Sequence, residues 1–168
     1  VNMDLIQLLP LNDTGLESSP YNASSSCALN PIYITLKELD YVDTNPALQS
    51  ELNLLKRYSY LQRIAYESVY NQKMRFLRIY YSHVFKLFEN SSEYHEFIEK
   101  HEWVKEYALF KVLKDQYNHK DWYEWHSENK NLSHKRVRHV FKNYKTQMDF
   151  YCFIQYLCFR QMRAVSLY

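Results

Sequence analysis

The sequence is almost without glycine. Gly15 is the only one in 168 residues, where average usage would supply about twelve. All four prolines lie in the first 46 positions, so residues 47–168 contain neither glycine nor proline. Sandwiches and closed barrels need many tight turns, and the usual turn residues are missing here. This excludes an all-β protein. A complete (β/α)₈ barrel is nearly excluded as well, because it normally takes about 250 residues. Residues 47–168 are therefore predicted to be mostly helical.

The chain also lacks a strong net charge and a membrane-length apolar run. Its formal net charge is +2, too small to indicate a nucleic-acid or membrane partner. The longest apolar run, residues 150–159, has about half the length that a membrane helix needs. Residues 130–145 are basic but match no nucleic-acid-binding module, which favours a solvated helix face. This stretch carries Lys130, Lys135, Arg136, Arg138, Lys142 and Lys145.

Patterns typical of metal, disulfide and nucleotide sites are missing too. The three cysteines, Cys27, Cys152 and Cys158, cannot all pair and form no Cys-x-x-Cys motif, so we expect ordinary buried thiols in a reducing cytoplasm. Residues 95–99 (HEFIE) begin like a zinc-protease motif, but Glu99 stands where a second histidine is required. One glycine cannot build a phosphate-binding loop. We therefore predict no metal site and no cofactor.

Two short strands are predicted near the N-terminus. Residues 5–9 (LIQLL), ended by Pro10, form an apolar run typical of a strand buried on both faces. After Pro31, the apolar residues Ile32, Ile34 and Leu36 alternate along the chain as in a second short strand. Because natural chains seldom begin inside a core element, the start at Val1 leads us to expect a truncated chain.

The sequence from Asn45 onward predicts helices. Asn45 before Pro46 is a start signal, and Asn90-Ser91-Ser92 can cap a further helix from about Glu93. Residues 103–117 carry an amphipathic aromatic pattern, and residues 150–165 are apolar nearly all round, which predicts deep burial. One helix face is marked by spacings of three and four, at Tyr70, Met74, Leu77, Tyr81, Val84 and Phe88.

Three segments together resemble a known family. Residues 8–15 (LLPLNDTG) and 19–21 (SPY), then Ser25, Ala28 and Asn30-Pro31, closely resemble the signature loop of amylomaltases. These are the 4-α-glucanotransferases, or disproportionating enzymes, of bacteria and plants. Residues 106–110 (EYALF) with 122–125 (WYEW), and residues 150–161, agree in the same order. The resemblance spans nearly the whole chain.

The resemblance implies a fragment from the N-terminal half of a (β/α)₈ (TIM) barrel. The fragment itself would be mainly α-helical, with one or two short strands near the N-terminus. Residues 1–46 would form an early barrel strand and its substrate-lining loop. Residues 47–168 would form a helical insertion that leads to the next barrel strand, not a complete domain.

The resemblance also implies an activity for the parent enzyme. The family cuts α-1,4-glucans and passes the released segment to another glucan by a retaining, covalent mechanism. Its three catalytic carboxylates lie on later barrel strands, so this chain would hold no catalytic residue and would be inactive alone. Expected substrates are maltodextrins, glycogen or starch, in the cytoplasm, with no cofactor, nucleic acid or membrane involved.

Two residues of the loop match sugar-binding positions of the family, Ser19 and Tyr21. A tyrosine ring can stack on the apolar face of a glucose while hydroxyls bind its rim. Four further residues are predicted to be loop scaffold, since short polar side chains bond to nearby backbone. These are Asn12, Asp13, Pro20 and Asn30.

Two other hypotheses stay open. One is a helical interaction or glucan-binding module without catalysis, consistent with the aromatic stripe and the absent carboxylates. A lone chain of this kind would expose large apolar surfaces, which argues against it. The other is a nucleic-acid binder, which rests on residues 130–145 alone and would require strongly salt-dependent duplex binding.

Overall fold

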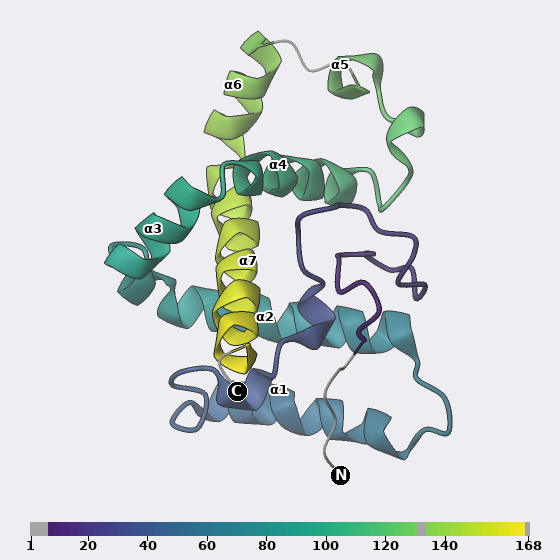
Figure 1. Ribbon diagram of the computed structural model, residues 1–168, viewed down its shortest axis with the longest axis vertical. Helices are drawn as coiled ribbons and strands as arrows, with labels where there is room; N and C mark the ends of the chain where they lie inside the picture. Colours follow the sequence, from purple (N-terminus) through teal and green to yellow (C-terminus); the bar gives the residue numbers. More distant parts are fainter. Residues whose placement is uncertain (1–6, 131–133, 167–168) are drawn as a thin grey trace. The chain divides into compact units, whose positions relative to one another are not determined.

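A computed structural model describes residues 7–130 and 134–166 (Figure 1). The chain forms two compact units, the first made of residues up to Ser82 and from Cys158 onward, the second of residues 83–157. The predicted division between residues 1–46 and 47–168 stays a prediction. The 3₁₀ helices are η1 (Pro31–Tyr33), η2 (Leu36–Glu38), η3 (Arg57–Tyr60) and η4 (Trp122–Glu124). The α-helices are α1 (Pro46–Lys56), α2 (Tyr66–Phe88), α3 (Ser92–Lys100), α4 (Trp103–Gln116), α5 (Ser127–Lys130), α6 (His134–Asn143) and α7 (Lys145–Val165).

Two helices begin at caps that the sequence predicts. The Asn45 side chain accepts hydrogen bonds from the Ala47 and Leu48 N–H groups, with Pro46 at the first helical position of α1. Ser91 caps α3 by accepting from the Tyr94 N–H. These side chains satisfy N–H groups that have no partner within the helix. The predicted helix along the aromatic stripe is confirmed as α2, and the one over residues 103–117 as α4.

In the first unit, helix α1 lies beside the early turns of α2 (Figure 1). Glu51 of α1 accepts from Gln72 over 2.7 Å and pairs with Arg75 over 3.1 Å. Buried apolar side chains form the core of this unit. Its buried members include Ile34, Leu36, Leu39, Val42, Leu48, Phe76 and Leu77.

The prediction of one or two N-terminal strands is wrong. Leu5 and Ile6 of the first predicted strand lie outside the described residues, and residues 7–9 form no strand. Residues 31–38 fold as η1 and η2. Across the described ranges the chain has no strand, only an isolated antiparallel bridge between Asn12 and Leu29.

Residues 31–38 form no strand because side chains satisfy the backbone groups around η1. Lys73 Nζ donates to the carbonyls of Ile32 and Ile34, over 2.5 and 2.8 Å. The Ile32 N–H donates to Asn30 Oδ1 over 3.0 Å. Side chains thus satisfy backbone groups that a neighbouring strand would otherwise satisfy. The alternation of apolar residues reflects a buried segment of 3₁₀ turns.

The second unit is packed around aromatic rings. Phe153 of α7 is fully buried, and its ring centroid lies 5.5 Å from those of both Phe85 and Phe88 of α2. The ring centroids of Tyr94 in α3 and of Tyr156 lie 6.3 and 6.0 Å from that of Phe153. Residues 150–158 of α7 are buried, as predicted, and its last turns are more exposed. Burial of those last turns in the complete protein stays a prediction.

Candidate functional site

Residues 12–30 form a loop whose two ends are joined by backbone hydrogen bonds. The Asp13 N–H donates to the Ala28 carbonyl over 2.8 Å, and the Asn30 N–H donates to the Leu11 carbonyl over 2.9 Å. Within the loop, the Ser24 N–H donates to the Asp13 carbonyl over 2.7 Å. The loop therefore has a defined path even though its turns belong to no helix or strand.

Asp13 and Gly15 form the first turn of this loop. Asp13 is fully buried, and its Oδ1 accepts from the Gly15 N–H over 2.9 Å. Gly15 has φ +62°, in the left-handed region that glycine adopts without a Cβ penalty. A Cβ there would meet only Ser24 Oγ, at 3.9 Å. The backbone conformation, not lack of space, is what favours glycine at this position.

Ser19 and Tyr21, the predicted sugar-binding residues, lie on one turn. The Ser19 N–H donates to Glu17 Oε1 over 3.2 Å, and the Asn22 N–H donates to the Ser19 carbonyl over 3.2 Å. Ser19 and Pro20 are half-buried, whereas Tyr21 is 75% exposed. An exposed ring beside a hydroxyl can stack on a sugar and bind its rim. The sugar-binding role of both residues stays a prediction.

Two side chains of the loop, Thr14 and Asn30, form a closed polar network with Tyr66 of α2. Asn30 Nδ2 donates to Thr14 Oγ1 over 3.1 Å and to the Tyr66 hydroxyl over 2.8 Å. The Thr14 and Tyr66 hydroxyls lie 3.0 Å apart. Thr14 donates its single proton to the Glu17 carbonyl over 2.6 Å, so Tyr66 is the donor to Thr14. Each proton in this network has an acceptor.

Sequence reasoning missed two members of the network. Asn30 was predicted as scaffold, and the structure places it buried between Thr14 and Tyr66. Thr14 stands inside the recognised loop motif, which could have drawn attention to it. Tyr66 lies 36 residues beyond Asn30, at the start of α2, and no local pattern connects the two. Asn12 pairs with Leu29 at the isolated bridge that closes the loop.

Lys73 also supports the segment that follows the loop. Its amine donates to the carbonyls of Ile32 and Ile34, and burial lowers the pKa of Lys73 to about 8. Cys158 lies nearby, and burial raises the pKa of its thiol, which keeps the sulfur neutral at physiological pH. Neither residue is arranged for chemistry on a ligand. Lys73 supports η1 through these two bonds, and Cys158 lines a groove that borders the loop.

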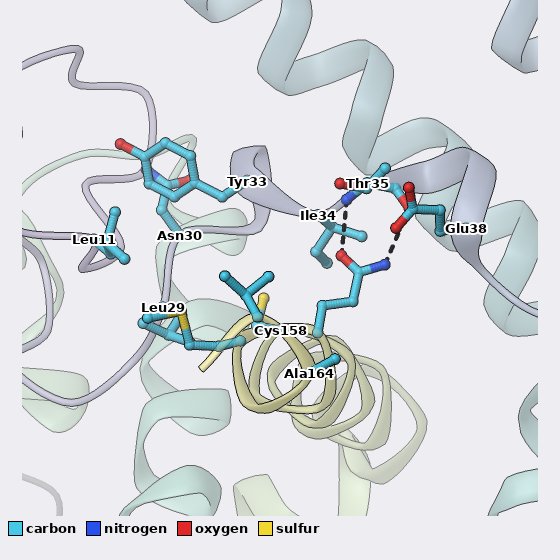
Figure 2. A pocket seen from close by; sticks show the side chains of 12 residues that line it. Leu11, Leu29, Asn30, Tyr33, Ile34, Thr35, Glu38, Cys158 and Ala164 are labelled. Carbon is cyan, nitrogen blue, oxygen red and sulfur yellow. Dashed lines mark hydrogen bonds between the residues drawn. The ribbon is translucent and has the colours of Figure 1, made fainter. Parts of the chain in front are cut away.

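A groove of about 300 Å³ in the first unit borders the loop (Figure 2). Gln161 of α7 lies on one side, where its Oε1 accepts from the Thr35 N–H over 2.8 Å and its Nε2 donates to the Thr35 carbonyl over 3.1 Å. The surface is mainly apolar, with polar residues that include Asn30, Thr35 and Glu38. Its lining includes Leu11, Leu29, Ile34, Met162, Ala164 and Val165.

In residues 7–130 and 134–166, no three histidine, cysteine or acidic side chains gather closely enough to hold a metal ion. In that same part of the chain, none of the helices combines the length and apolar character needed to cross a bilayer.

Comparison with known proteins covers the entire chain. A family model described as 4-alpha-glucanotransferase matches residues 1–168. A 4-alpha-glucanotransferase of Chlamydia caviae is 34% identical over 171 residues, covering 98% of this chain and 31% of the relative. One from Aquifex aeolicus is 34% identical, covering 98% and 32%. One from Synechocystis is 30% identical, covering 96% and 32%.

These three relatives carry the same name. The chain spans about a third of their length. Because the family model matches from the first residue to the last, the chain belongs to the 4-alpha-glucanotransferase family.

Proposed function

We propose that the natural protein containing this chain is a 4-α-glucanotransferase that moves α-1,4-glucan segments between maltodextrins. The observation that carries the proposal is the family match over residues 1–168. It is supported by an ordered loop that presents Tyr21 to solvent, with the ring 75% exposed. An exposed aromatic on a fixed loop suits binding of a neutral polymer whose rings have apolar faces.

In this proposal the loop binds sugar and the chemistry takes place elsewhere. Tyr21 stacks on one glucose unit, and the Ser19 hydroxyl bonds to a rim hydroxyl. The catalytic carboxylates lie outside this chain and act by a retaining mechanism, in which the two working carboxyl groups stand about 5 Å apart. A covalent glycosyl-enzyme then delivers the segment to a sugar hydroxyl in place of water. Residues 1–168 alone are therefore expected to be inactive.

The proposed substrates are maltodextrins, glycogen or starch, and the proposed location is the cytoplasm. Three free thiols, Cys27, Cys152 and Cys158, are consistent with a reducing compartment. The proposal includes no cofactor, since transfer of a glycosyl segment needs only carboxylates and a sugar acceptor.

Incubation of the complete natural protein with maltotriose tests the proposal. We expect glucose together with longer maltodextrins, separated by chromatography, because one sugar donates a segment and another accepts it. Residues 1–168 under the same conditions serve as the control and should give neither. Hydrolysis of maltotriose to glucose and maltose alone would contradict glucan transfer. Binding of maltodextrin without any turnover would favour the glucan-binding module instead.

A further inference from the structure

We infer that Tyr66 is a positioning residue that fixes the turn carrying Ser19 and Tyr21, an inference that rests on the proposed function for its effect on glucan. Tyr66 lies at the first position of α2, far from the loop in sequence. Its hydroxyl bonds to Thr14 near the start of the loop and to Asn30 at its end. One hydroxyl on a helix thus ties both ends of the loop.

A continuous path of hydrogen bonds connects this hydroxyl with Ser19. Tyr66 donates to Thr14 Oγ1 over 3.0 Å, and Thr14 donates to the Glu17 carbonyl over 2.6 Å. The Glu17 carboxylate in turn accepts from the Ser19 N–H over 3.2 Å. A backbone bond from the Glu17 N–H to the Thr14 carbonyl, 3.1 Å, closes the turn between them. Loss of the first donor therefore loosens the residues that follow it.

Among the residues that the structure describes, the hydrogen bonds of the network leave no donor that could replace Tyr66. The proton of Thr14 is used on the Glu17 carbonyl, and the two protons of Asn30 Nδ2 are directed to Thr14 and Tyr66. Without the tyrosine hydroxyl, one Asn30 proton and one Thr14 lone pair lose their partner in a buried place, since Thr14 is 6% and Asn30 2% exposed. Buried polar groups left unpaired are costly, and a change in the loop's conformation would relieve the cost.

The ring of Tyr66 can be kept while its hydroxyl is removed. The ring stacks on Tyr70 with centroids 6.5 Å apart, a contact that Phe preserves. Tyr66→Phe therefore isolates the hydroxyl. Tyr60→Phe is the matched control, because Tyr60 is 86% exposed and belongs to no part of this network. Thr14→Val and Thr14→Ser test the next bond of the path, since serine keeps the hydroxyl and valine does not.

Two measurements on the complete natural protein test the inference. First, amide hydrogen exchange of residues 13–24 should be about tenfold faster in Tyr66→Phe than in wild type or Tyr60→Phe. Second, the KM for maltotriose should rise about tenfold with kcat changed less than threefold, the equivalent of one lost hydrogen bond. Thr14→Ser should raise KM less than Thr14→Val, and Tyr66→Phe combined with Thr14→Val should raise it little further.

The outcomes separate this inference from the proposed function. Unchanged exchange of residues 13–24 in Tyr66→Phe would overturn the positioning role. So would a lower melting temperature with wild-type KM, because that pattern belongs to a purely structural tyrosine. Faster exchange in a wild-type protein that transfers no glucan would support Tyr66 as the residue that fixes the loop and contradict the glucanotransferase proposal instead.

Discussion

In the loop of residues 12–30, order comes from polar atoms, whereas in the second unit it comes from aromatic rings. Thr14 and Asn30 are buried, and the side-chain protons of both residues have hydrogen-bond acceptors. Around Phe153 the contacts are ring to ring, with centroids 5.5 to 6.3 Å apart. Both regions bury side chains, but those of the loop are polar and those of the second unit are aromatic.

The difference follows from the backbone. A helix satisfies its own N–H and carbonyl groups, so its side chains can be apolar and packing can be non-directional. A loop lacks that ladder, and its buried backbone groups need side-chain partners. Asp13 and Asn30 supply such partners at Gly15 and Ile32. Directional bonds can fix a loop without covering its tip, which leaves Tyr21 open to solvent and available for a ligand.

The largest expected effect lies in the aromatic cluster. Phe153→Ala in the complete protein should lower the free energy of unfolding by about 4 kcal/mol, because it removes a fully buried ring and leaves a cavity. Leu87→Ala is the control, since Leu87 is 61% exposed, and should cost less than about 0.5 kcal/mol. Urea titration followed by circular dichroism provides both values. Equal losses would show that the cluster is not the core of the second unit.

The polar loop should respond less, and through different atoms. Asn30→Ala removes the oxygen that accepts from the Ile32 N–H. It also removes the amide that donates to the Thr14 and Tyr66 hydroxyls. We expect a loss of about 2–3 kcal/mol, mainly from the buried groups left unpaired. Asn22→Ala, at an exposed position of the same loop, is the comparison. A loss below that of Asn22→Ala would mean that the network does not hold the loop.

A pH titration distinguishes the polar region from the aromatic one. Burial lowers the pKa of Lys73 from 10.5 to about 8, so between those values the unfolded chain holds a proton that the folded chain has released. Stability relative to Lys73→Met should therefore rise with pH across this window, by about 1–2 kcal/mol because part of the side chain stays in water. Thermal unfolding from pH 7.5 to 10 measures it.

The control for that titration is Lys86→Met, an exposed lysine later on the same helix. Its stability difference from wild type should stay flat over the same pH range. A flat difference for Lys73→Met as well would contradict the burial of its amine against the Ile32 and Ile34 carbonyls.

How far the sequence predicted the structure depends on how local each signal is. The caps at Asn45 and Ser91 were predicted correctly because a capping side chain bonds within three residues. The segment around Ile34 was not, because its carbonyl partner is Lys73, 39 residues away. Alternating apolar residues look alike whether a neighbouring strand or a lysine side chain satisfies the backbone.

The candidate site shows the same limit. The loop motif brought Ser19, Tyr21 and the scaffold residues to attention as a resemblance, and several of these residues share one closed loop. Tyr66 went unnoticed because its contacts with Thr14 and Asn30 span 52 and 36 residues. Contacts of that range depend on how α2 packs against the loop, which composition and periodicity do not specify.

The most direct test of the account is the KM for maltotriose of Tyr21→Ala in the complete protein, with Tyr60→Ala as the matched control. Both rings are exposed, 75% and 86%, so neither change should cost more than about 0.5 kcal/mol of stability. We expect a KM about tenfold higher for Tyr21→Ala, the loss of one stacking contact, and a wild-type KM for Tyr60→Ala. A wild-type KM for both would contradict the claim that this loop binds the glucan.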